Sequence, residues 1–294
     1  MKAMILAAGL GTRLRPLTDT RPKALVEVAG RTLLEITLSR LSSFGIHDVI
    51  INVHHFPEMI LDYLKAHNNF GLHIEISREE HLLDTGGGLK KASWFFLQDS
   101  AHAEEPFVLH NVDVISTIDL RRMLEFHKEK QALATLAVQH RESSRQLLFD
   151  ADFRLCGRRV APDQAAELVR SNLANTLQES THWEGTAPHS AETNKDCHSE
   201  PAAAGEESAF SGSHAGHSPP LQPFAFSGIH IISPRLLQMM REEGAFSIID
   251  TYLRLTSGGE RILAFQSDDA YWRDLGRPDD LRRVAEDSRQ RAIF

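Results

Sequence analysis

The sequence predicts an α/β fold with a doubly wound, mostly parallel sheet. Short apolar segments typical of buried strands alternate with segments of helical periodicity from the first residue to Val138. The first strand-like segment ends in a glycine-containing loop, Gly9-Leu10-Gly11, a feature of sheets that bind ligands at their carboxyl edge. Strands that alternate with helices at this spacing require right-handed crossovers, which place the strands in parallel.

The expected elements of this first part follow one another in regular order. We expect strands at residues 3–8, 48–53, 73–76, 107–109 and 132–138. The expected helices run from Thr32 to Gly45 and over residues 57–64, 86–96 and 120–128. Pro57 suits the first turn of a helix.

The second part of the chain has a different pattern. Residues 147–149 and 153–155 predict a short hairpin, and residues 224–232 predict a long strand. The remaining expected elements are a helix opened by Pro234, a helix at 248–255, a strand at 262–265 and a helix at 279–289.

Residues 161–220 consist mainly of Ala, Ser, Glu, His, Gly and Pro. A segment with so few aliphatic side chains buries too little apolar surface to offset its ordering entropy, so we expect a disordered, low-complexity insertion. Apolar residues recur at helical spacing over residues 165–177, so a short helix within the insertion is an alternative for that stretch. The expected organisation is a single domain made of residues 1–160 and 221–294, interrupted by this insertion.

The length and composition of the chain limit its function. A chain of 294 residues can bury a substantial core. The formal net charge of −8 and the lack of a dense basic patch argue against nucleic acid as a partner. Two cysteines are too few for a disulfide framework, so we expect a cytoplasmic location. No stretch is long enough to span a bilayer, so we expect no membrane partner.

The loop after the first strand has the composition of a phosphate-binding site. Gly9 and Gly11 let backbone amides approach a ligand closely. Arg13, Arg15 and Lys23 add three cations suited to phosphate oxygens. The alternative is a solvated basic loop. The pattern lacks the Gly-Lys-Ser/Thr of a Walker loop and the third glycine of the dinucleotide fingerprint.

A second glycine-rich segment, Thr85-Gly86-Gly87-Gly88, opens the helix expected at residues 86–96. Glycines at a helix N-terminus admit a flat base against backbone amides. A flexible loop is the alternative interpretation.

Two aspartates complete the candidate site. Asp113 follows the strand at 107–109, and Asp274 lies between an aromatic pair and a glycine turn. A helix N-cap is an equally good explanation for Asp113 taken alone. If both carboxylates reach one crevice, they form a hard-oxygen site suited to Mg²⁺ with bound phosphates.

These four segments resemble, in the same order, the motifs of the sugar-1-phosphate nucleotidyltransferases. The resemblance covers nearly the whole chain except the low-complexity segment. It implies a Rossmann-like nucleotidyltransferase fold with a smaller sugar-binding lobe. It also implies a catalytic role for Arg13, Lys23 and Asp113, and a Mg²⁺ site at Asp113 and Asp274. The residues that the resemblance assigns to the nucleotide are Leu6, Ala7, Ala8, Gly9, Gly11, Thr12, Arg13, Lys23, Thr85, Gly86 and Gly87; those assigned to the sugar are Asn111, Ser227 and Gly228.

The activity that the resemblance implies is the formation of an NDP-sugar and pyrophosphate from an NTP and a sugar 1-phosphate. UTP and N-acetylmuramate 1-phosphate are the expected pair, in a monomer or small homo-oligomer. Transfer from GTP to mannose 1-phosphate and a non-catalytic nucleotide-sugar sensor are the alternatives. Where the family commonly has Asn-Gly-Asp, this chain has Asn111-Val112-Asp113, so the added side chain could narrow the crevice.

Overall fold

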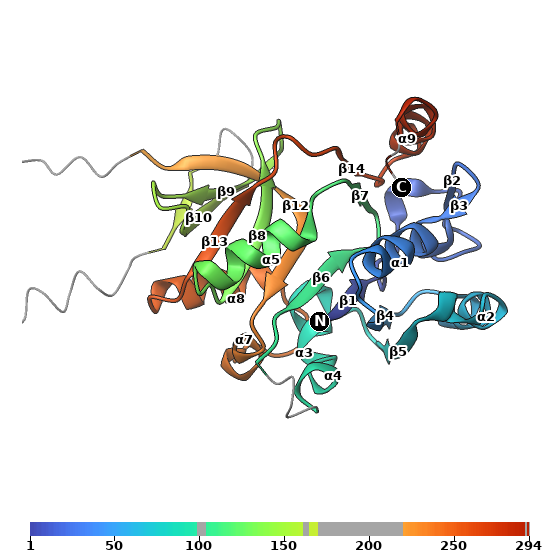
Figure 1. Ribbon diagram of the computed structural model, residues 1–294, viewed down its shortest axis with the longest axis horizontal. Coiled ribbons are helices and arrows are strands. Elements are labelled where there is room, and N and C mark those ends of the chain that lie inside the picture. The colour runs from blue at the N-terminus through green and yellow to red at the C-terminus, as the bar shows by residue number, and fades with distance from the viewer. Residues whose placement is uncertain (99–103, 161–164, 170–219, 292, 294) are drawn as a thin grey trace, which may run out of the picture.

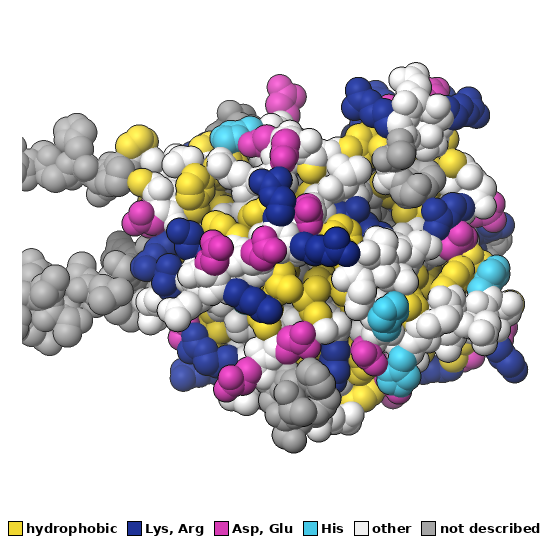
Figure 2. Space-filling model, in the orientation of Figure 1, with side chains coloured by type: hydrophobic (Ala, Val, Ile, Leu, Met, Phe, Trp, Pro, Cys, Tyr) yellow, Lys and Arg dark blue, Asp and Glu magenta, His cyan; other side chains and the backbone are white. Residues whose placement is uncertain are grey.

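The computed structural model describes residues 1–98, 104–160, 165–169, 220–291 and 293. Most of its strands form one large sheet that runs through the molecule, with helices packed along it (Figure 1). Figure 2 shows cationic and anionic side chains interspersed over the face drawn there. That face therefore lacks the single-sign field that attracts nucleic acid.

The core of the sheet confirms the predicted fold class. Strands β5 (His73–Arg78), β4 (Asp48–Val53), β1 (Lys2–Leu6) and β6 (Phe107–Asn111) pair in parallel in this order. Next to β6, β12 (Gln222–Ile232) runs antiparallel to its neighbours. Beyond it, β8 (Ala134–Gln139) and β13 (Ile262–Gln266) return to the direction of β1. The sheet is therefore mostly parallel, with β12 reversed.

The two faces of the sheet support separate hydrophobic cores, because successive side chains of a strand point to opposite faces. Ala3 and Ile5 of β1 pack with α1 (Leu33–Ser43) and α5 (Leu120–Glu129), while Met4 packs with the other set of helices. The further helices of the first core are α2 (Pro57–Ala66) and α9 (Pro278–Gln290); those of the second are α3 (Asp84–Lys91), α4 (Trp94–Leu97), α7 (Arg235–Met239) and α8 (Ile248–Ser257). Helices on both faces are the doubly wound arrangement that the sequence predicts.

A smaller antiparallel lobe extends from β12. Strand β9 (Arg145–Phe149) pairs with the start of β12, and β10 (Leu155–Val160) pairs with β9 as the predicted hairpin. β11 (Glu167–Leu168) then pairs with β10. The short helix that periodicity permitted from residue 165 is therefore wrong over Glu167–Leu168, because the backbone there pairs with β10 instead. Residues 161–164 and 170–219 of the predicted insertion lie outside the described residues.

Several short elements were not expected from the sequence. β7 (Val114–Ser116) pairs with β14 (Trp272–Asp274), and β2 (Glu27–Val28) pairs with β3 (Arg31–Thr32). The helix expected over residues 86–96 is two helices, α3 and α4, separated at Ala92 and Ser93. No helix in the described part of the chain is both long and apolar enough to cross a membrane.

Candidate functional site

The loop after β1 lies where the order of the sheet reverses, since β1 has β4 on one side and β6 on the other. In open α/β sheets, ligands bind at the carboxyl ends of the strands at such a switch point. Gly11 adopts φ +64°, and a Cβ there would lie 2.9 Å from Thr18 Cγ2 and 3.1 Å from Lys23 Cβ. The absence of a side chain at Gly11 therefore lets residues 18 and 23 fold back onto the loop.

The structure brings the predicted cations and carboxylates together as two ion pairs. Lys23 is only 8 % exposed, and its Nζ donates to Asp113 Oδ2. Arg13 Nη2 lies 3.7 Å from Asp274 Oδ2. The two aspartates meet because β7 pairs with β14, which sets Asp274 opposite Val114. Neither aspartate is a helix N-cap, so the alternative interpretation of Asp113 is wrong.

Gly276 makes room for the Arg13 guanidinium. A Cβ at this position would lie 2.6 Å from Arg13 Nη2 and 2.8 Å from Arg13 Cζ. The glycine turn after Asp274 thus brings the backbone against the arginine. Thr12 and Arg13 belong to a short 3₁₀ helix, η1 (Thr12–Leu14), on the exposed side of the loop.

The carboxylates fit a hard divalent cation that also binds ligand phosphates. Burial and the neighbouring Asp113 carboxylate raise the pKa of Asp274, against the attraction of Lys23 and Arg13. Asp274 Oδ1 is buried and has no hydrogen-bond partner. No cluster of three metal-ligating side chains occurs among the described residues. A Mg²⁺ ion bound by Asp113 and Asp274 would therefore depend on phosphate oxygens and water for its remaining ligands.

A cavity of about 490 Å³ opens beside the loop, at the carboxyl ends of β1, β4, β5 and β6. This volume lies in the range of small-molecule sites, roughly 300–1,000 Å³. The residues that line it are Leu6, Ala8, Gly9, Asn52, Glu79, Leu82, Asp84, Thr85, Asn111 and Ala245. Five of them, Leu6, Ala8, Gly9, Thr85 and Asn111, belong to the set expected from the sequence.

Asn52 and Glu79 also line the cavity, although neither was expected from the sequence. The Asn52 Oδ1 accepts the backbone N–H of Ala7 at 2.7 Å, and its Nδ2 donates to Glu79 Oε1 at 2.7 Å. Glu79 Oε2 accepts the N–H of Leu83 at 3.0 Å. Asn52 lies near the end of β4, which pairs with β1, and Glu79 directly follows β5, which pairs with β4. Ligands bind at this carboxyl edge of the sheet, so the rule applied to Asp113 points to both residues as well.

The glycines of α3 serve close packing. A Cβ at Gly86 would lie 2.3 Å from the Phe246 ring, and one at Gly87 would lie 2.3 Å from the Gly244 carbonyl oxygen. The N–H groups of Gly86 and Gly87 both donate to the Phe246 carbonyl, at 2.9 and 3.4 Å. Neither residue lines the cavity. The two glycines instead draw residues 244–246 against α3, so that Ala245 forms one wall.

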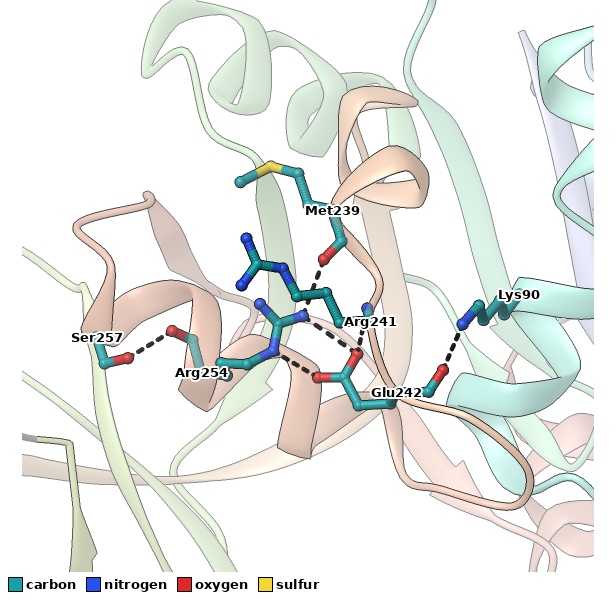
Figure 3. Close-up of polar contacts among 6 residues, drawn as sticks. All are labelled: Lys90, Met239, Arg241, Glu242, Arg254 and Ser257. Atoms are coloured by element: carbon teal, nitrogen blue, oxygen red, sulfur yellow. Dashed lines mark hydrogen bonds and ion pairs between the residues drawn. The ribbon is translucent and has the colours of Figure 1, made fainter.

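A charged pair holds this wall in place (Figure 3). Arg254 Nε and Nη2 donate to the Glu242 carboxylate at 2.7 and 3.1 Å, and Nη2 also donates to the Met239 carbonyl. Burial raises the pKa of Glu242, but the hydrogen bonds that its carboxylate accepts and the charge of Arg254 together outweigh burial and lower that pKa to about 2. Lys90 of α3 donates to the Glu242 backbone carbonyl. The segment between α7 and α8 is therefore fixed to both α8 and α3.

The predicted sugar-side residues also lie together. β12 is irregular between Phe226 and His230, and Gly228 there adopts φ +74°. A Cβ at Gly228 would lie 2.9 Å from Asn111 Nδ2. The Ser227 carbonyl accepts the indole N–H of Trp272 at 2.7 Å. Val112 does not narrow the cavity, because it is 3 % exposed and packs in the core beside α1.

Comparison with known proteins places this geometry in context. Residues 2–147 match the family model described as nucleotidyl transferase. The chain is 45 % identical over 116 residues to an N-acetylmuramate alpha-1-phosphate uridylyltransferase of Caulobacter vibrioides, a match that covers 38 % of this chain and 46 % of that protein. It is 39 % identical over 139 residues to mannose-1-phosphate guanylyltransferase 1 of Arabidopsis thaliana, covering 47 % and 38 % respectively. The matches span less than half of these curated relatives.

The likeness in structure extends over the whole chain. The crystal structure of HddC from Yersinia pseudotuberculosis, complexed with GMP-PN, superposes with a TM-score of 0.63 and 19 % sequence identity. This superposition covers 98 % of this chain and 99 % of HddC. The two chains share the same fold.

Proposed function

We propose that the protein, whose residues 2–147 match the family model described as nucleotidyl transferase, transfers a nucleotidyl group from an NTP to a sugar 1-phosphate. The observation that carries the proposal is the meeting of the Lys23–Asp113 and Arg13–Asp274 pairs beside a cavity of nucleotide size. Cations that face carboxylates at a sheet switch point suit a reaction between two phosphorylated substrates.

The proposed reaction is a displacement at phosphorus. A phosphate oxygen of the sugar 1-phosphate attacks the α-phosphorus of the NTP, the bond to the β-phosphate oxygen breaks, and pyrophosphate leaves with that oxygen. The protein contributes alignment and charge neutralisation, because the reaction needs no covalent enzyme intermediate. The β1 loop holds the triphosphate against the backbone, while Lys23 and Arg13 stabilise the leaving pyrophosphate and the crowded phosphorus.

Asp113 and Asp274 are the residues that would hold Mg²⁺. The bound ion would neutralise phosphate charge as the bond to pyrophosphate breaks. The orphaned Oδ1 of Asp274 and its raised pKa are both consistent with an acid group that lacks its partner.

For the nucleotide and the sugar, we propose UTP and N-acetylmuramate 1-phosphate. The 45 % identity to the Caulobacter uridylyltransferase over 116 residues supports this pair. Identity of 39 % to the Arabidopsis guanylyltransferase supports GTP and mannose 1-phosphate as the second candidate. A non-catalytic sensor is the third, although retention of Lys23, Asp113 and Asp274 favours an enzyme.

The test is a panel of four NTPs, each combined with N-acetylmuramate 1-phosphate or mannose 1-phosphate, with pyrophosphate release as the readout. We expect the highest kcat/KM for UTP with N-acetylmuramate 1-phosphate. A higher value for GTP with mannose 1-phosphate would move the assignment to the second candidate. Nucleotide binding without pyrophosphate release for any pair would identify a sensor.

A further inference from the structure

Arg141 is a half-buried cation near the candidate site, and no carboxylate of a described residue lies within ion-pair distance of it. Lys23 and Arg13 each face an aspartate, so their charges are already matched within the protein. Arg141 is half-buried, and its Nη2 donates at 2.6 Å to the backbone carbonyl of Phe226, a neutral acceptor. A partly desolvated guanidinium without a counter-ion costs stability unless an anion completes its environment.

The position of Arg141 is held by an aromatic support. Its Cζ lies 3.6 Å from the centroid of the Trp272 ring, the geometry of a close cation–π contact. The Trp272 indole is in turn fixed by its N–H bond to the Ser227 carbonyl. The guanidinium is therefore preorganised, so a ligand that binds it does not have to order a free side chain.

The surroundings connect Arg141 to the proposed reaction centre. Trp272 and Asp274 are two residues apart on β14 and so lie on the same face of that strand. Burial lowers the pKa of Arg141, and the Asp274 charge partly offsets this effect. The Ser227–Gly228 turn, expected to face the sugar, provides the acceptor for Trp272.

Three buried polar atoms around Arg141 lack hydrogen-bond partners within the protein. Arg141 Nε, Ser227 Oγ and Asp274 Oδ1 are all buried and have no hydrogen-bond partner. Ser227 is completely buried. Buried polar groups of a native fold normally have hydrogen-bond partners, so these three atoms need an explanation. A bound polar ligand or ion would provide partners for the donor, the hydroxyl and the carboxylate together.

We propose that Arg141, supported by Trp272, is the anion-binding group for the phosphate of the second substrate, a phosphate monoester. This assignment rests on the proposed function. Arg141 supplies a positive charge that is not already neutralised by an aspartate, unlike the charges of the two ion pairs. This charge lies on the proposed sugar side of Asp113 and Asp274. A planar fork suits a phosphate with two oxygens available for bidentate contact.

The test measures the binding of the two substrates separately. Titration calorimetry would measure the binding of N-acetylmuramate 1-phosphate and of mannose 1-phosphate. Each ester would be added to protein that already holds the α,β-methylene analogue of UTP or of GTP. We expect Arg141→Gln to weaken ester binding ten- to hundred-fold, the scale of one lost charge-assisted bond, with analogue affinity unchanged. Arg141→Lys should bind the ester at an intermediate level, because lysine keeps the charge and loses the stacked fork.

Arg122→Gln serves as the matched control, since Arg122 is exposed and pairs with Asp269 on the surface. Ester binding by Arg141→Gln equal to the wild type, or an equal loss of analogue and ester binding, would overturn the assignment of Arg141. A wild-type protein that binds the analogue and neither ester would contradict the proposed function itself. The two failures are thus distinguishable.

Discussion

Lys23 is nearly buried and bonded to Asp113, which makes it the cation with the most fixed position in the site. A fixed charge stabilises a transition state without reorganisation, so we expect Lys23→Ala to lower kcat about 10²–10³-fold. Steady-state kinetics with both substrates varied would measure this loss. Lys65→Ala, at an exposed position on α2, is the control. A change confined to KM would instead make Lys23 a ground-state binding group.

The ionisation of Asp274, a proposed metal ligand, also affects the stability of the fold. Burial and Asp113 raise its pKa above the ordinary 3.8, so the folded state holds this proton more tightly than the unfolded state does. The contribution of Asp274 to the free energy of unfolding is therefore fully present below pH 3.8. It is lost as the pH rises through the pKa that Asp274 has in the folded state. At neutral pH the charged carboxylate destabilises the fold.

We accordingly expect Asp274→Asn to abolish turnover and to raise the Tm at pH 7. The gain in Tm should fade as the pH falls towards 3.8, because Asp274 of the folded wild type is then mostly protonated and, like asparagine, uncharged. Thermal unfolding of variant and wild type across this pH range, without added metal, checks the sign. Near wild-type turnover at saturating Mg²⁺ would show that Asp274 is not a metal ligand.

At the scale of elements, the segment between α7 and α8 positions the Ala245 wall of the cavity through the Glu242–Arg254 pair. Removing one partner leaves a partly buried charge unmatched, so Glu242→Gln should loosen the wall. We expect KM for the NTP to rise roughly ten-fold, equivalent to about 1.4 kcal/mol, with kcat little changed. Arg235→Gln, which breaks the pair with Glu260 outside the cavity lining, should leave KM unchanged.

The packing of α3 on the same segment gives a second prediction. A methyl group at Gly86 would overlap the Phe246 ring, so Gly86→Ala should destabilise the fold by about 1–3 kcal/mol. The same displacement should weaken nucleotide binding. Gly258→Ala is the control, since a Cβ there meets only the Leu255 carbonyl at 3.4 Å. Equal Tm values for the two variants would show that the helix and the segment are not tightly packed.

For the whole molecule, the chain before and after the low-complexity segment enters one continuous sheet. β9 pairs with both β10 and β12, which bring the two flanks together. Shortening a connection from about fifty to about ten residues changes its closure entropy by only about 1.4 kcal/mol. We expect replacement of residues 170–219 by a short Gly/Ser linker to preserve the fold and kcat/KM. A folded variant with lost kcat/KM for the sugar phosphate would assign that segment a role in binding.

The sequence predicted the β1 loop and the two aspartates because strand ends and glycine turns leave local signals. It did not reveal that β7 and β14 pair, since strands of three residues have too little periodicity to detect. That pairing is what joins Asp113 to Asp274. The packing role of Gly86 was also hidden, because its partner Phe246 lies far along the chain. Arg141 belongs to no motif, and its stacking on Trp272 and its unsatisfied Nε become apparent only in the structure.

Nucleotidyl transfer at this site can be tested by phosphorus NMR of the wild-type protein with UTP, N-acetylmuramate 1-phosphate and Mg²⁺, alongside Lys23→Ala and Asp113→Asn. We expect the wild type to form a pyrophosphate diester and free pyrophosphate in equal amounts, and Asp113→Asn to form neither on the same timescale. Lys23→Ala should form both slowly. Orthophosphate as the main product, or diester formed equally by the wild type and Asp113→Asn, would contradict nucleotidyl transfer at this site.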